Sequence, residues 1–96
     1  MNVNSINDGN FFTAGFELNV AETIKIFDAQ ATCDATILIM NHSNRSVYVG
    51  PTDKVSDTNG FPVRPVSTLE IKLPQGSSLY ATTQGGCKIE ILATLW

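Results

Sequence analysis

The feature of this sequence that most restricts its fold is the alternation of apolar and polar residues over short segments. In the segment Ser67–Leu73, apolar residues alternate with polar ones such as Glu70 and Lys72, and residues 87–91 repeat the pattern. Such alternation places apolar side chains on one face of a β-strand, whereas a helix needs them three to four residues apart. The pattern therefore predicts strands that bury one face.

The amino-acid composition supports the same class of fold. Ile, Val and Thr together account for 25 of the 96 residues, and these β-branched residues prefer strands to helices. Charged residues make up only 16% of the chain and hydrophobic residues 43%, which excludes disorder of the whole chain. Two domains would each have too little interior at this length. We expect one all-β domain.

About seven short strands are expected, separated by turns. They lie at 22–27, 35–41, 47–49, 61–66 and 67–73, with two more that begin at residues 79 and 87. This spacing is typical of a small antiparallel β-sandwich, with either immunoglobulin-like or jelly-roll strand order.

Three of these segments carry more specific signals. The segment 35–41 holds four consecutive apolar residues, so we expect a central strand with both faces covered. The segment 47–49 is interpreted as its hairpin partner, and Gly85–Gly86 as the turn of a second hairpin. Pro62 and Pro65 lack amide donors, which restricts 61–66 to a sheet edge.

The first twelve residues differ from the rest of the chain. Asn occurs four times among the first ten residues, and such a polar segment buries too little apolar area to order itself. We therefore expect a flexible N-terminal arm at 1–12 and a β-sandwich domain at 13–96. The aromatic residues Phe11, Phe12 and Phe16 follow the polar stretch, and they either cap the core or contact a partner.

Charge and leader signals narrow the partners and the compartment. The net charge is −3, and the six Lys and Arg residues are scattered singly, which disfavours nucleic-acid binding. No apolar stretch approaches the length that spans a bilayer, and residues 1–10 do not form a secretory signal. We expect a protein made in the cytoplasm, without nucleic-acid or membrane partners.

The sequence offers little catalytic or metal chemistry. His42 is the single histidine and lies in a polar turn, where it is expected to be solvated. The acidic loop 52–60 does not match a calcium-binding loop and is interpreted as turns. Cys33 and Cys87 are interpreted mainly as buried thiols rather than as a disulfide. We expect a protein that is not an enzyme and has no metal or cofactor.

Several short motifs together resemble small β-sandwich structural proteins of tailed-bacteriophage virions. The motifs are Asn41-x-Ser43, Val47-Tyr48-Val49-Gly50, Asn59-Gly60-Phe61-Pro62-Val63, Pro65, Leu79-Tyr80-Ala81 and Ile89-Glu90-Ile91-Leu92. The resemblance implies a capsid decoration, or cement, protein. Such a protein is located in the virion, forms a homotrimer, binds the assembled major capsid protein or another virion protein, and stabilises the shell.

Candidate partner-binding residues come from the aromatic cluster and from the proline-rich edge. They are Phe11, Phe12, Phe16, Pro62, Val63 and Pro65. Aromatic residues favour interface centres, and ordinary core or turn packing is the alternative for each of the six. A second hypothesis is a tail, neck or fibre component, or a module that binds a receptor or glycan through exposed Tyr48, Tyr80 or Trp96.

Overall fold

The computed structural model describes the backbone at residues 3–8, 11–19, 22–28 and 34–95, and the side chains from Thr13 onward within those ranges. The described residues form nine strands and contain no helix that is long and apolar enough to cross a membrane. The strands are β1 (Val3–Asp8), β2 (Phe11–Leu18), β3 (Thr23–Asp28), β4 (Ala35–Asn41), β5 (Val47–Gly50), β6 (Phe61–Val63), β7 (Ser67–Leu73), β8 (Ser78–Thr83) and β9 (Cys87–Leu95).

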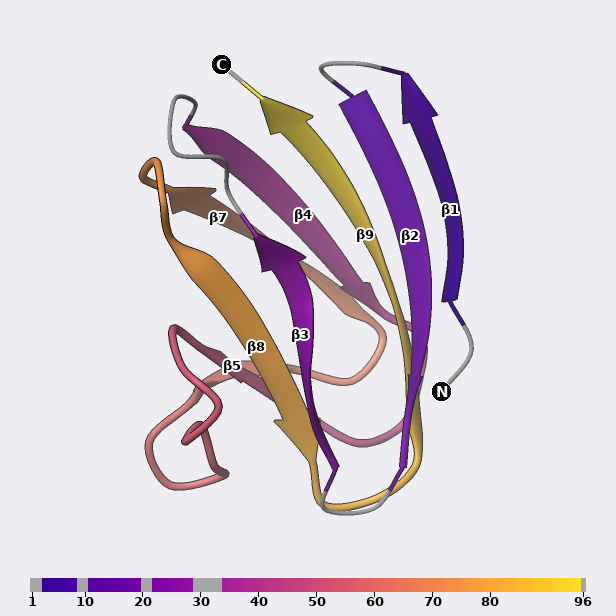
Figure 1. Ribbon diagram of the computed structural model, residues 1–96. Helices are drawn as coiled ribbons and strands as arrows, with labels where there is room; N and C mark the ends of the chain where they lie inside the picture. The colour runs from indigo at the N-terminus through magenta and orange to yellow at the C-terminus, as the bar shows by residue number, and fades with distance from the viewer. Residues whose placement is uncertain (1–2, 9–10, 20–21, 29–33, 96) are drawn as a thin grey trace.

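The strands form two antiparallel sheets that pack face to face (Figure 1). One sheet has the order β1-β2-β9-β4-β7 and the other the order β3-β8-β5-β6. From β2 onward the chain crosses from sheet to sheet after nearly every strand, and only β5 and β6 follow each other within one sheet. This alternation is the jelly-roll order. The predicted all-β sandwich is confirmed, and jelly-roll rather than immunoglobulin-like order is the one observed.

The core lies between the inner faces of the two sheets. Ile37 and Ile39 of β4 and Ile89 and Ile91 of β9 are at most 2% exposed, and β4 pairs with β9 along its whole length. Alternate residues of β9 point to solvent, as the alternating pattern predicted. Burial of these branched side chains contributes about 1.5–3 kcal/mol each.

Two predicted hairpins are wrong, because their strands lie in different sheets. β4 pairs with β7 and β9, whereas β5 pairs with β6 and β8. Likewise, Gly85 and Gly86 connect β8 to β9 across the sandwich. Adjacent segments with matching alternation suggest a hairpin, but the same pattern suits two strands that face each other across a core. The outer face of β4 is also more open than predicted, since Met40 is 38% exposed.

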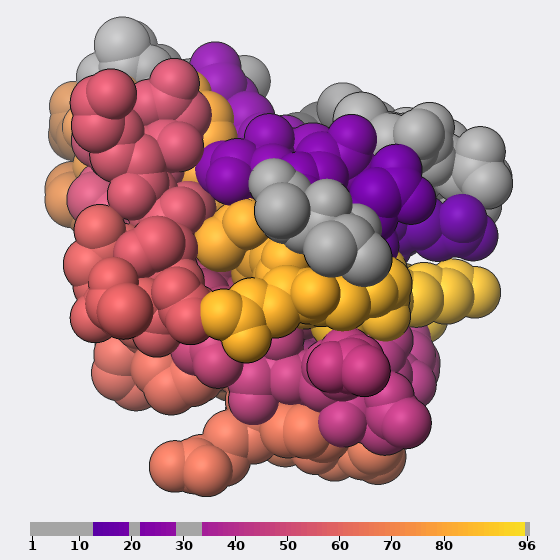
Figure 2. All heavy atoms as spheres, turned by 90° about the horizontal axis from the view of Figure 1, so that it is seen from below, coloured from indigo at the N-terminus to yellow at the C-terminus, as the bar shows by residue number. Residues whose placement is uncertain are grey.

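The connections β4–β5 and β8–β9 meet at one end of the sandwich, which Figure 2 shows from below. The His42 amide donates to the Lys88 carbonyl at 3.0 Å, and the Lys88 amide donates to Ser43 Oγ at 2.7 Å. The Thr83 hydroxyl donates to the Ser46 carbonyl at 3.2 Å. These hydrogen bonds connect the two crossings to each other.

The N-terminal segment differs from the expected arm. Within 1–12, the described backbone forms β1 and the start of β2, and β1 pairs with β2 in continuous register from Val3↔Phe16 to Asp8↔Phe11. An edge strand is held by main-chain hydrogen bonds, which do not require apolar side chains. The expected boundary between residues 12 and 13 therefore falls inside a strand.

Candidate functional site: an apolar groove between β6 and β7

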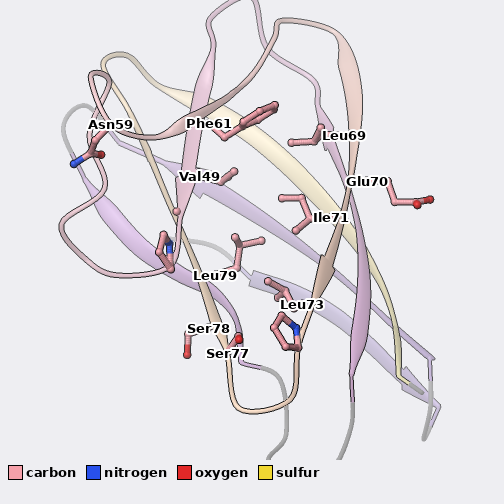
Figure 3. Close-up of a pocket in the computed structure, with 13 residues that line it drawn as sticks. Val49, Asn59, Phe61, Leu69, Glu70, Ile71, Leu73, Ser77, Ser78 and Leu79 are labelled. Carbon is pink, nitrogen blue, oxygen red and sulfur yellow. The ribbon is translucent and has the colours of Figure 1, made fainter.

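The candidate site is a groove at the open side of the sandwich, where the edge strands β6 and β7 face each other (Figure 3). We call it the β6–β7 groove, and its volume is about 570 Å³. Most of its lining side chains are aliphatic or aromatic. The lining residues are Val49, Gly50, Pro51, Asn59, Phe61, Leu69, Glu70, Ile71, Leu73, Pro74, Ser77, Ser78 and Leu79.

The groove exists because β6 is too short to cover β7. β6 has three residues, whereas β7 has seven. Leu69 and Ile71 point inward from β7 but stay only half-buried, and the Phe61 ring is 61% exposed. Figure 3 shows Phe61 extended toward Leu69, with Val49 and Leu79 opposite Ile71. The sandwich therefore leaves apolar surface open where the core would otherwise close.

The polar groups around the groove mostly have partners within the chain. Asn59 Oδ1 accepts from the Ser56 amide at 2.7 Å, and its Nδ2 donates to the Lys54 carbonyl at 3.2 Å. The Ser78 hydroxyl donates to the Asp28 carboxylate. Figure 3 shows the Glu70 side chain directed away from the groove. The groove thus offers apolar contact and few hydrogen bonds to a ligand.

The Asp28 carboxylate, which accepts the hydrogen bond from Ser78, has a shifted pKa. The pKa of Asp28 is lowered, first by the hydrogen bond from Ser78 and then by the hydrogen bond from Lys25. Lys25 Nζ lies 3.3 Å from Asp28 Oδ2, and the pKa of Lys25 is raised, mainly by that bond. Lys25 Nζ also lies 5.9 Å from the centre of the Tyr80 ring. The exposed charges of Lys25 and Asp28 therefore form an ion pair at the surface.

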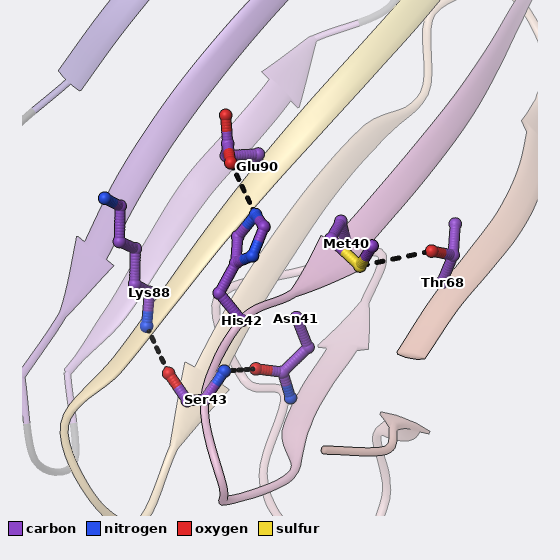
Figure 4. A network of polar contacts seen from close by, with 7 residues as sticks. All are labelled: Met40, Asn41, His42, Ser43, Thr68, Lys88 and Glu90. Atoms are coloured by element: carbon purple, nitrogen blue, oxygen red, sulfur yellow. Dashed lines mark hydrogen bonds and ion pairs between the residues drawn. The ribbon is translucent and has the colours of Figure 1, made fainter. Parts of the chain in front are cut away.

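A second polar network covers the outer face of the five-stranded sheet near the end of β4 (Figure 4). His42 Nε2 contacts Glu90 Oε1, a contact that becomes an ion pair when the imidazole is protonated. The Thr68 hydroxyl donates to Met40 Sδ at 3.2 Å. Within the described ranges, no three His, Cys, Asp or Glu side chains gather as a metal-binding group. His42 therefore has a carboxylate partner, and these residues do not supply a metal centre.

Of the two cysteines, Cys87 is the one that the structure describes. Cys87 is a free, buried thiol whose Sγ lies 3.1 Å from Thr83 Oγ1. Cys33 lies outside the described residues. Cys87 thus packs as the small buried residue that the alternation predicted.

The six predicted partner-binding residues do not form one surface. Phe16 and Val63 are core residues, 6% and 1% exposed. Pro62 and Pro65 are exposed on β6 and in the turn after it. Phe11 and Phe12 begin β2, and their side chains lie outside the described residues. Partner binding itself stays a prediction. Phe16 and Val63, however, lie in the core, and core packing was the alternative interpretation of these residues.

The residues that line the groove were predicted only as core. Leu69, Ile71 and Leu73 were expected to face inward, and they do. The available signal was the pair Pro62 and Pro65, which shortens the strand opposite. Tyr48 and Tyr80, the suggested binding platform, are half-buried, and Trp96 is not described.

Comparisons with known proteins identify the class of fold. An RmlC-like cupin protein from Desulfovibrio desulfuricans matches with a TM-score of 0.66 at 12% identity, covering 96% of this chain and 81% of that one. A cupin superfamily protein from Desulfitobacterium hafniense matches with a TM-score of 0.62 at 13% identity, covering 98% and 77%. No family model matches the sequence, and no curated protein does. The likeness shows a cupin-like fold.

A third solved structure carries an enzymatic description. It is a sugar phosphate isomerase from a cupin superfamily of Silicibacter pomeroyi, with a TM-score of 0.54 at 12% identity, covering 90% of this chain and 51% of that one. Proteins with this fold thus include enzymes, and the fold alone does not decide whether this chain is one.

These comparisons correct the functional expectation. The three solved structures named above are described as cupin proteins and not as phage virion proteins, so the predicted capsid decoration function is wrong. The alternatives of a tail, neck or fibre component, or of a receptor- or glycan-binding module, gain no support either. The quoted motifs are strand ends and tight turns, which recur in unrelated sandwiches. The trimeric state and the virion location rested on the same resemblance.

Proposed function

We propose that this domain binds a small, uncharged, largely apolar molecule in the β6–β7 groove and does not catalyse a reaction there. The observation that carries this proposal is an open groove of about 570 Å³ whose lining is mainly aliphatic and aromatic. Small-molecule sites commonly occupy about 300–1,000 Å³ and have such linings.

The charge of the lining favours an uncharged ligand. Glu70, the one acidic or basic residue in the lining, directs its carboxylate away from the groove. Burying a charged ligand without a partner is costly, whereas apolar surface gains about 25 cal/mol per Å². Ser77 contributes a hydroxyl at one end, and its amide is already bonded to the Pro74 carbonyl. An elongated apolar molecule with a neutral polar end matches this arrangement.

The same lining supports the non-catalytic part of the proposal. General acid–base chemistry needs a titratable side chain within hydrogen-bond reach of the reacting group. The inward side chains from β5, β6, β7 and β8, namely Val49, Phe61, Leu69, Ile71, Leu73 and Leu79, carry no such group. Affinity would therefore come from burial and shape.

Fluorescence of N-phenyl-1-naphthylamine, an uncharged apolar probe, tests the binding. We expect saturable binding at one site per chain. Leu69→Gln places an amide in the groove and should weaken binding about tenfold, since a buried leucine contributes about 1.5–3 kcal/mol. Leu92→Gln is the matched control, because Leu92 is also half-buried but lies on β9 outside the groove lining.

Two results would overturn the proposal. Absence of saturable probe binding, or equal loss in the Leu69→Gln and Leu92→Gln variants, would show that the groove is not the site. The non-catalytic part is tested by incubating the protein with glucose 6-phosphate and following isomerisation by NMR. We expect no turnover, and measurable turnover would contradict this part.

A further inference from the structure

β7 is a regular strand at one edge of the five-stranded sheet. It pairs with β4 residue by residue from Ser67 to Leu73 without a register shift, and no described strand pairs with its other side. The edge strands of the other sheet are both interrupted, β6 by Pro62 and β3 by a register shift between Lys25 and Phe27. Such interruptions discourage the pairing of edges between chains. β7 carries no such protection.

The side chains of β7 are self-complementary about Ile71. Glu70 and Lys72 flank this residue and are exposed on the outer face, while Leu69 and Leu73 flank it on the inner face. If two β7 strands pair antiparallel with Ile71 opposite Ile71, Glu70 of each copy lies opposite Lys72 of the other. In the same register, Leu69 of each copy lies opposite Leu73 of the other. Directly opposite residues share a face of the sheet, so both contacts are favourable.

Neighbouring registers lack this match. Centring the pair on Glu70 places two glutamates opposite each other, and centring it on Lys72 does the same with two lysines. Like charges directly opposite each other are destabilising. The sequence of β7 therefore favours one register, with a two-fold axis at Ile71.

We propose that two copies of this chain associate through β7, joining their five-stranded sheets into one continuous sheet with Ile71 on the two-fold axis. A contact of this kind is isologous and closes at the dimer. It supplies main-chain partners for the β7 edge and covers inner apolar side chains that the monomer leaves half-exposed, Leu69 and Ile71. The proposal does not depend on ligand binding in the groove.

Charge exchange tests this register directly. Glu70→Lys and Lys72→Glu each turn two attractive cross-strand pairs into repulsive ones, so each variant should dimerise at least about tenfold more weakly. An equimolar mixture of the two variants places lysines opposite glutamates again and should form heterodimers. Sedimentation velocity at low salt measures all three samples, and circular dichroism verifies that each variant is folded.

Asp53→Lys and Lys54→Glu are matched controls, because they change the same charges in the exposed loop after β5. Both should dimerise like the wild type. A wild-type chain that stays monomeric at high micromolar concentration would refute the proposal. A dimer that the β7 variants leave unchanged, or a mixture that fails to form heterodimers, would also refute it.

Discussion

The side chain of Asn41 tests how the chain crosses between the sheets. Asn41 is fully buried at the end of β4. Its Nδ2 donates to the Arg45 carbonyl at 2.8 Å and to the Val63 carbonyl at 3.0 Å, and its Oδ1 accepts from the Ser43 amide at 2.9 Å. One amide thus shapes the turn after β4 and connects it to β6.

The expected magnitude follows from the three partners of Asn41. Asn41→Leu keeps the number of side-chain heavy atoms and their branching but removes all three hydrogen bonds. Each of the three lost hydrogen bonds contributes about 0.5–1.5 kcal/mol, and water does not replace the one to the buried Val63 carbonyl. We therefore expect a loss of about 2–4 kcal/mol in the free energy of unfolding. For a domain of this size, the midpoint of thermal unfolding falls by at least about 8 °C.

Urea denaturation followed by circular dichroism measures the change. Asn44→Leu is the matched control, because Asn44 is exposed in the same turn and should change stability by less than about 0.5 kcal/mol. Hydrogen exchange should also accelerate in β6 of the Asn41→Leu variant. A loss below about 1 kcal/mol, or equal losses in both variants, would refute the claim that this amide joins the turn to β6.

Three further substitutions test local features. Ser78→Ala should raise the pKa of Asp28, which NMR measures. The hydrogen bond from the Ser78 hydroxyl contributes most, ahead of the one from Lys25, to the lowering of this pKa from its ordinary value of 3.8. A carboxyl group with a lowered pKa stabilises the fold at pH values above its ordinary pKa, and this stabilisation disappears as the pH falls through the lowered pKa. The variant should therefore be less stable than the wild type at neutral pH and nearly as stable as the wild type in strong acid. Gly60→Ala should cost about 1–3 kcal/mol, measured by urea denaturation, since the added methyl would lie 2.7 Å from a side-chain carbon. Val66→Asn should gain about 1 kcal/mol in the same assay, because Val66 has a φ of 50° and its side chain is 75% exposed.

Each of these expectations has a contrary result. An unchanged Asp28 pKa in the Ser78→Ala variant would remove the hydroxyl as its cause. Gly15→Ala is the control for Gly60→Ala, because a methyl at Gly15 meets nothing closer than 3.8 Å. Equal stability of these two variants would contradict the crowding at Gly60. A Val66→Asn variant that is less stable than the wild type would contradict backbone strain there.

Strand positions were largely predictable because they depend on local patterns. The segments 35–41 and 67–73 were expected with the bounds that β4 and β7 have. Pairing was not predictable in the same way. Alternation tells which residues face a core, but it does not tell whether the next strand lies beside the first or across from it. The connection from β4 to β5 crosses the sandwich, and the contact between Asn41 and Val63, 22 residues apart, has no local signature.

The candidate site was predictable only in its parts. Leu69 and Ile71 were recognised as inward-facing, and Pro62 as a residue that limits its strand to an edge. A groove, however, arises from the difference in length between two strands that face each other. That difference appears only once β6 and β7 are known to lie at the same open side of the two sheets.

The proposed ligand and the proposed second copy both contact the inner side chains of β7, but only the dimer depends on the outer charges, so the two proposals can be separated. The ligand contacts inner side chains such as Leu69, whereas the register of the dimer depends on Glu70 and Lys72 on the outer face. The Lys72→Glu variant should therefore lose self-association and keep its binding of the apolar probe, because Lys72 is not among the residues that line the groove. If it lost both, the groove would be completed only by the second copy. Loss of probe binding with an intact dimer would instead show that the charge at residue 72 acts on the groove directly.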